Sequence, residues 1–231
     1  MIDGDCYFAN KDGLVVFGWQ HLDGNTYYFD ETTGIRTVSE ANIDNKDWYF
    51  DEEGVLKRGI VELPEGKRYY LTNGGFATGL YSVKDKTYLF DENGYMQTGF
   101  ITLDDKEYYF QDNDGTMYRG WMQQGDEFYY YFADGSKAYG FVNIDGGKHY
   151  FESSKGVMLT GWQDIDDSRY YFDNAGVMVS GATNISGSLY YFDGSGRLSS
   201  GEGWFVNNAK KYYKLGDGKI ATGFKDIDSS R

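Results

Sequence analysis

The chain has 231 residues and a formal net charge of −14, and 19% of its residues are aromatic, including 23 Tyr and 16 Phe. Nucleic-acid-binding surfaces and proteins on anionic membranes both depend on Lys and Arg, so this charge disfavours both kinds of partner. Glycine is abundant (32) and proline nearly absent (1), while the single cysteine excludes an intrachain disulfide. Rings and glycines in these numbers predict short strands joined by tight turns.

One sequence skeleton recurs along the chain in units of about twenty residues. Residues 161–181 read G-W-Q-D-I-D-D-S-R-Y-Y-F-D-N-A-G-V-M-V-S-G. The order is Gly, an aromatic residue, a polar loop, three rings (the triplet), a turn that ends in Gly, and often Met before the next Gly. Taken in chain order, the triplets are predicted to end at Phe8, Phe29, Phe50, Leu71, Phe90, Phe110, Phe132, Phe151, Phe172, Phe192 and Lys214.

Each unit is predicted to form a β-hairpin whose turn follows the triplet. Aromatic residues favour strands, and Asp or Asn followed by Gly, as in residues 91–94, suits a tight turn. The returning strand would carry Met, for example Met96 or Met178. A lone hairpin is marginal in water, so neighbouring hairpins must stabilise one another. The predicted fold is all-β: an elongated β-solenoid of about eleven stacked β-hairpins.

The strand period divides each triplet between two faces. The first and third residues share one face, and the middle residue points to the other. Third residues are nearly all Phe, so we place them in the dry interior. Middle residues are Tyr except for Leu89, and such a Tyr would bury its ring between hairpins while its hydroxyl finds a partner.

Residues 1–231 are predicted to be a single repeat array, because no linker interrupts the period. No run of about 18 apolar residues is present, so we expect no membrane insertion. The N-terminus does not read as a signal peptide. Since the chain opens and closes inside a repeat, we expect it to be a fragment of a longer protein.

The pattern G-W-x-x-(I/L)-D-G…Y-Y-F-D-x-x-G-x-M-x-(T/S)-G resembles the cell-wall-binding repeats of Gram-positive surface proteins. This group includes choline-binding modules, glucan-binding tails of glucansucrases and receptor-binding repeats of large clostridial toxins. The resemblance covers essentially the whole chain. It implies stacked hairpins attached to a separate effector domain, in a secreted or cell-surface bacterial protein.

Choline-binding members hold a quaternary ammonium between rings through cation–π attraction. The resemblance implies that this cage needs the Trp after Gly and a second Trp directly before the Tyr-Tyr pair. That second position is predicted to hold Asp5, Thr26, Asp47, Arg68, Thr87, Glu107, Tyr129, Lys148, Arg169, Leu189 and Lys211. Only Tyr129 is aromatic there, and long cations such as Arg169 would repel choline. The sequence therefore favours a glycan over choline.

Six residues are candidates for ligand binding. A partly exposed ring in a groove between hairpins would stack on a pyranose, and the same ring could instead only cover the seam between hairpins. Tyr129 could likewise be an inserted ring that covers a neighbour. The candidates are Trp19, Trp121, Trp162, Trp204, Phe141 and Tyr129.

The sequence does not point to catalysis. His21 and His149 lie in different units, and Cys6 occupies a packing position. Carboxylates recur at turn positions, which is the pattern of a solvated rim. Residues 112–115 are similar to the start of a calcium loop, but the later bidentate Glu is missing. We therefore expect no enzyme activity, no cofactor and no metal.

The leading hypothesis is a non-catalytic module that binds polysaccharide or cell-wall glycan by multivalent ring stacking. Its other expected partner is an effector domain elsewhere in the full-length protein. Three alternatives stay open: a choline-binding wall anchor, a receptor-binding module for host glycans, and a structural spacer without a ligand.

Overall fold

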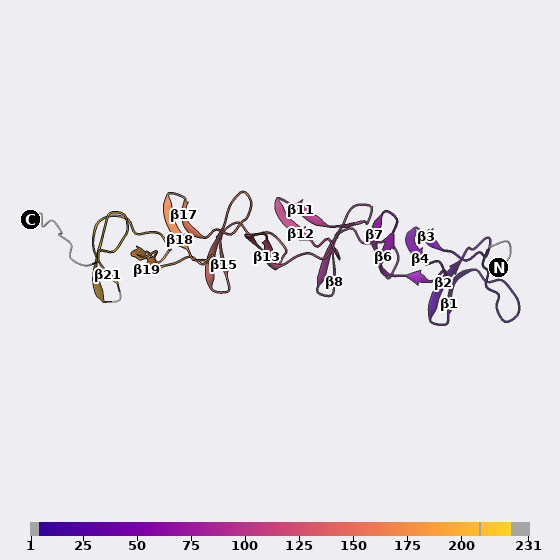
Figure 1. The fold of residues 1–231 in the computed structure, drawn as a ribbon. Helices are drawn as coiled ribbons and strands as arrows, with labels where there is room; N and C mark the ends of the chain where they lie inside the picture. The colour runs from indigo at the N-terminus through magenta and orange to yellow at the C-terminus, as the bar shows by residue number, and fades with distance from the viewer. Residues whose placement is uncertain (1–4, 208, 223–231) are drawn as a thin grey trace, which may run out of the picture. The chain divides into compact units, whose positions relative to one another are not determined.

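A computed structural model describes residues 5–207 and 209–222 of the chain. Within these residues the regular structure consists of ten β-sheets of two or three strands, which follow one another along the sequence (Figure 1). The same part of the chain contains no helix of the length and apolarity needed to cross a membrane. The prediction of an all-β array of hairpins is confirmed.

The hairpins fall into two compact units, Met1–Tyr118 and Arg119–Arg231, each described here by itself. In the N-terminal unit the paired strands are β1 (Gly18–Leu22) with β2 (Asn25–Phe29), β3 (Ser39–Ile43) with β4 (Lys46–Phe50), β6 (Gly59–Leu63) with β7 (Gly66–Tyr70), β8 (Gly79–Val83) with β9 (Lys86–Phe90), and β11 (Gly99–Leu103) with β12 (Lys106–Phe110). Two short strands, β5 (Leu56–Lys57) and β10 (Met96–Gln97), each add a third strand to a sheet.

The C-terminal unit repeats the same pairing. Its hairpins are β13 (Gly120–Gln124) with β14 (Glu127–Tyr131), β15 (Gly140–Ile144) with β16 (Gly147–Phe151), β17 (Gly161–Ile165) with β18 (Ser168–Phe172), β19 (Gly181–Ile185) with β20 (Ser188–Phe192), and β21 (Gly203–Asn207) with β22 (Lys210–Lys214).

The main turn of each hairpin lies before the triplet, so the predicted position after the triplet is wrong. In β1–β2, Leu22 pairs with Asn25 across Asp23 and Gly24, whose φ angles are 50° and 81°. Two successive positive φ angles are typical of a type I′ turn, whose twist matches that of the strands. The turn after the triplet closes only a short contact, such as the bridge between Phe172 and Met178.

Strand pairing also moves two predicted triplet ends by one residue. Tyr70 and Tyr131 lie opposite the first glycine of their hairpins, as Phe110 does in its own. The predicted ends Leu71 and Phe132 are therefore one residue late. Both errors arose where an extra apolar residue follows two tyrosines, which left the limits of the triplet ambiguous.

The first repeat departs further from the prediction. Its described residues form no five-residue ladder, and an isolated bridge joins Ala9 to Val15. By comparison with the other bridges, its triplet ends at Ala9 rather than at the predicted Phe8, which is exposed. With these three corrections, successive triplets end 20 to 22 residues apart.

The third residue of the triplet forms the core of nine hairpins, as predicted, whereas β21–β22 has the half-buried Lys214 there. Phe172 is fully buried, and it clusters with Ile165, Tyr170 and Met178. The middle residue, Tyr171, pairs with Trp162 on the opposite face. The fully buried or nearly buried third residues are Phe29, Phe50, Tyr70, Phe90, Phe110, Tyr131, Phe151, Phe172 and Phe192.

Neighbouring hairpins are also joined through their backbones. The Met178 amide, which follows β18, donates a 2.7 Å hydrogen bond to the Lys148 carbonyl in β16. One repeat later, the Leu198 amide donates to the Arg169 carbonyl at 2.6 Å. The returning segment of one repeat therefore satisfies the strand of the repeat before it, which is how hairpins that are weak alone become stable together.

Candidate functional site

In four described hairpins an aromatic residue after the repeat glycine contacts the first triplet residue of the next hairpin. The Trp162 ring lies 5.2 Å from Tyr171 in its own hairpin and 4.9 Å from Tyr190 in the next. The ring therefore bridges the outward face of one hairpin and the inward face of the following one. We call each such ring contact between two hairpins an aromatic crease and name it after the residue that follows glycine. The residue just before the triplet is called the pre-triplet residue.

The Trp19 crease contains a second tryptophan that the sequence analysis missed. The Trp19 ring centre lies 4.9 Å from that of Trp48, the first triplet residue of the next hairpin, and 5.1 Å from that of Tyr28 in its own hairpin. Trp19 is 38% exposed, and its pre-triplet residue is the uncharged Thr26. The signal for Trp48 was present, because the equivalent position holds Tyr in several other repeats.

The Trp121 crease differs from the other creases in having a third ring on its outward face, at the pre-triplet position. The corrected register makes Phe128 its pre-triplet residue, where Tyr129 was predicted. Trp121 pairs with Tyr130, two residues beyond Phe128, so Trp121 and Phe128 share one face of the hairpin. Their exposed fractions are 37% and 38%. His149 of the next hairpin, 5.2 Å from Trp121, forms the third wall.

Tyr129 lies on the inward face and is 8% exposed. Its hydroxyl donates a 2.5 Å hydrogen bond to Glu127. This bond to a carboxylate, together with burial, raises the pKa of Tyr129 to about 12. Lys137 places its ammonium 4.8 Å from the ring centre. The ring thus lies on the inward face of its hairpin rather than on the outward face.

Three other candidates carry a cation on the ring. In each case the cation is the pre-triplet residue of the same hairpin, and it lies at a cation–π distance from the ring centre. The pairs are Lys148 over Phe141 at 4.5 Å, Arg169 over Trp162 at 5.0 Å, and Lys211 over Trp204 at 4.7 Å.

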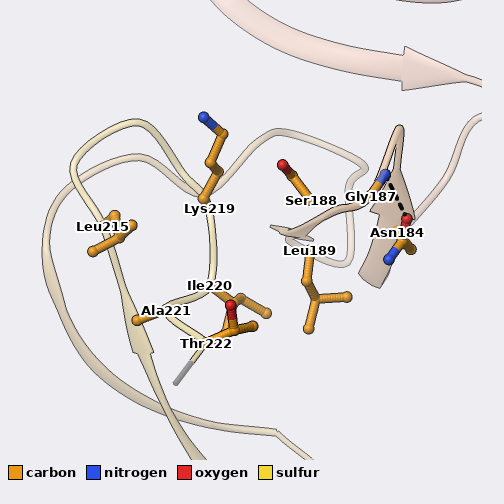
Figure 2. Close-up of a pocket in the computed structure, with 9 residues that line it drawn as sticks. All are labelled: Asn184, Gly187, Ser188, Leu189, Leu215, Lys219, Ile220, Ala221 and Thr222. Carbon is orange, nitrogen blue, oxygen red and sulfur yellow. Dashed lines mark hydrogen bonds between the residues drawn. The ribbon is translucent and has the colours of Figure 1, made fainter. Parts of the chain in front are cut away.

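Some hairpins lack a ring after glycine. In β19–β20 the two positions are Ala182 and Leu189. Figure 2 shows the cleft of about 430 Å³ beside them, where Leu189 and Ile220 lie close together while the Lys219 ammonium points away. Among the described residues, none of those that line this cleft is aromatic.

His149 is uncharged at neutral pH. It is 5% exposed, and its Nδ1 atom has no hydrogen-bond partner among the described residues. Burial lowers the pKa of His149 below its usual value, against a smaller opposing effect of the Gly176 carbonyl and of Asp173. A neutral imidazole can therefore line a crease that takes a cation, whereas an imidazolium would repel it.

Acidification should destabilise the fold through His149. The unfolded histidine takes up a proton near pH 6.5, while the folded one does so only at lower pH, so the unfolded chain binds more protons as the pH falls below 6.5. Urea unfolding at pH 7.5 and pH 5.5 measures this loss of stability. His149→Tyr, which places there the residue found at Tyr170, should reduce the loss.

His21→Gln, at an exposed position, is the control for removing a histidine as such. Equal pH dependence in the original protein and in His149→Tyr would contradict the role of His149.

In the described part of the chain, no group of three or more His, Cys, Asp or Glu residues is arranged to hold a metal ion.

Two family models match the chain. A choline-binding repeat matches residues 77–117 and 159–202, and a putative cell wall binding repeat matches residues 18–32 and 140–158, which together make up about half of the chain. The search of curated proteins gives no match.

Solved structures share the fold. Choline binding protein F from Streptococcus pneumoniae is 24% identical, with a TM-score of 0.63, and the match covers 98% of this chain and 93% of that one. CbpJ from the same species is 24% identical, with a TM-score of 0.62 and coverage of 95% and 92%. The pneumococcal autolysin LytC is 20% identical, with a TM-score of 0.56 and coverage of 96% and 52%.

Proposed function

Because this chain belongs to the choline-binding, or cell-wall-binding, repeat family, we propose that it attaches a secreted bacterial protein to the cell wall and that the Trp121 crease takes a choline-like quaternary ammonium group. The array would act without catalysis, as one part of a longer protein with an effector domain. Its place is at the cell surface.

The geometry of the Trp121 crease carries the proposal. Trp121 and Phe128 present two partly exposed rings on one face, and neutral His149 lines the crease from the next hairpin. Ring faces attract cations because their quadrupole is negative there. The net charge of −14 favours a cationic ligand. The sequence-based preference for a glycan rested on the near absence of rings from the pre-triplet positions and on the long cations found there. In the Trp121 crease the corrected register again places a ring, Phe128, at that position.

The relatives supply independent support. Choline binding protein F has also been solved with a peptidoglycan analogue, a tetrasaccharide-pentapeptide. The autolysin LytC has been solved with a synthetic peptidoglycan ligand. Both proteins share the fold and were solved with peptidoglycan-like ligands, and cell-wall material is the partner proposed for this chain.

Weak single contacts would suffice for attachment. One crease with millimolar affinity contributes about −4 kcal/mol. If a wall polymer also engages a second crease of the same chain, such as that of Trp19 and Trp48, avidity can exceed the single-site affinity by about 10² to 10⁴.

Sugar stacking, the leading hypothesis of the sequence analysis, is the second candidate. Phe100 is more than half exposed, and a partly exposed ring can cover a pyranose. A cleft of about 500 Å³ in the C-terminal unit offers hydrogen-bonding groups for sugar hydroxyls, including those of Asp167, Asp193 and Arg197.

Replacing Trp121 with Ala should weaken choline binding roughly tenfold, because a cation–π contact is worth about 0.5 to 2 kcal/mol and tenfold corresponds to about 1.4 kcal/mol. Phe128→Ala should act in the same direction. The measurement compares retention on choline resin, on purified Gram-positive cell wall and on dextran, with elution by free choline.

Leu80→Ala is the matched control, because Leu80 is exposed and occupies the same repeat position without forming an aromatic crease. It should bind like the original protein. Retention on dextran alone would favour sugar stacking, and affinity for animal glycans alone would favour receptor binding. A folded protein retained by none of these materials would favour a spacer.

A further inference from the structure

We propose that Lys148 and Arg169 act as built-in guests, which occupy the ring faces of the Phe141 and Trp162 creases and close them to external ammonium groups, and that Lys211 covers the Trp204 ring in the same way. The inference deepens the proposed function and rests on it. It assigns to the pre-triplet residue the choice between a crease that is open and one that is closed.

The three cations reach their rings by the same route. Arg169 pairs with Asp164, while Trp162 pairs with Tyr171 two residues further along the strand, so Arg169 is the diagonal neighbour of Trp162 on the outward face. The same register brings Lys148 to the ring of Phe141 and Lys211 to the ring of Trp204. A repeated register explains why the three cation-to-ring distances fall between 4.5 and 5.0 Å.

The guanidinium of Arg169 is further oriented by a carboxylate. Its Nε atom lies 3.6 Å from Oδ1 of Asp164 on the same face. Arg169 also remains on the solvent side of Trp162, with 54% of its side chain exposed. An incoming ligand would therefore meet the arginine before it met the indole.

A tethered cation has two advantages over a dissolved one. Its effective concentration at the ring is at least in the millimolar range expected of short flexible linkers, which matches or exceeds what a weakly bound ligand would need. Its positive charge also repels a second cation at close range. Displacing it would leave the side chain without its ring contact, while the ligand would gain only the same contact.

The Trp121 crease has no such guest at its pre-triplet position, because Phe128 carries no charge and adds a wall. The Trp19 crease has Thr26, which is neutral but adds no ring. The array thus contains one scaffold with two kinds of crease, and a single residue distinguishes them.

Titration with tetramethylammonium chloride, followed through the indole N–H signals of the tryptophans, tests the inference site by site. In the original protein the Trp121 signal should shift, while the Trp162 signal should stay within a tenth of that change. Arg169→Phe, which imitates the pair of Trp121 and Phe128, should make the Trp162 signal respond to a similar extent. Arg169→Gln, which removes the charge without adding a ring, should give a smaller response in the same direction.

Leu189→Phe is the matched control, because it adds a ring at the same repeat position in a hairpin where Ala182 offers no partner ring. In this variant no tryptophan signal should respond more than it does in the original protein. A Trp162 signal that already responds in the original protein would overturn the inference, as would one that stays silent in both Arg169 variants. A response of Trp162 in the variants while Trp121 stays silent in the original protein would uphold the closed creases and reject the proposed choline site.

Discussion

Phe172→Ala should lower the free energy of unfolding by about 3 to 5 kcal/mol, the usual range for removing a buried Phe side chain. The ring is fully buried, and its centre lies 6.5 Å from Tyr170 in its own hairpin and 6.4 Å from Tyr150 in the preceding one. Its loss therefore weakens two repeats at once, because neither hairpin is stable without its neighbour.

Urea unfolding followed by far-ultraviolet circular dichroism and by tryptophan fluorescence measures this change. Phe100→Ala is the control, since Phe100 is 57% exposed and contacts mainly Tyr109 at 4.6 Å. We expect a loss of about 1 kcal/mol there, the typical size for a point mutant. Similar losses for the two variants would mean that the triplet residues do not form the core.

Gly176→Ala should cost about 2 to 5 kcal/mol, from two separate sources. The residue has a φ of 73°, where an L-residue with a Cβ atom is disfavoured by about 1 to 2 kcal/mol. The added Cβ would also lie 2.4 Å from the sulfur of Met158 in the preceding repeat. Overpacking of this kind costs about 1 to 3 kcal/mol.

Gly181→Ala separates the two sources. Gly181 has the same φ of 73°, but its added Cβ would meet nothing within 4 Å, so only the backbone strain should appear. Adding Met158→Ala to Gly176→Ala should recover part of the packing loss, which a double-mutant cycle measures. Equal losses for the two glycine variants would show that the repeats do not pack through this turn.

The two unfolding predictions concern the scaffold, while ligand selection depends on other positions. The core triplet residue and the turn glycine face the neighbouring repeat, whereas the pre-triplet residue lies on the outward face. Phe128, Arg169 and Leu189 occupy this one position in three hairpins whose ladders have the same register. Exchanges there should therefore alter the ligand more than the fold.

Several features followed from the sequence with little ambiguity. The period of about twenty residues identified the repeat, and alternation along a strand placed Phe172 inward and Tyr171 outward, as the structure confirms. The main turn was misplaced, because the Asp- and Gly-rich segments on both sides of a triplet resemble turns equally. Only the pairing of Leu22 with Asn25 in β1–β2, and its equivalents, identified the long ladder.

The sequence thus determined which aromatic residues recur along the chain, but the tertiary structure decided which of them line a crease. A shift of one residue moves a side chain to the other face of a strand, so the register of β13 and β14 decided that Phe128 lines the Trp121 crease and that Tyr129 does not. Likewise, a lysine or arginine near a tryptophan in sequence could point anywhere. Cross-strand pairing is what sets Arg169 over Trp162, because the partner strand brings together residues that the sequence order separates.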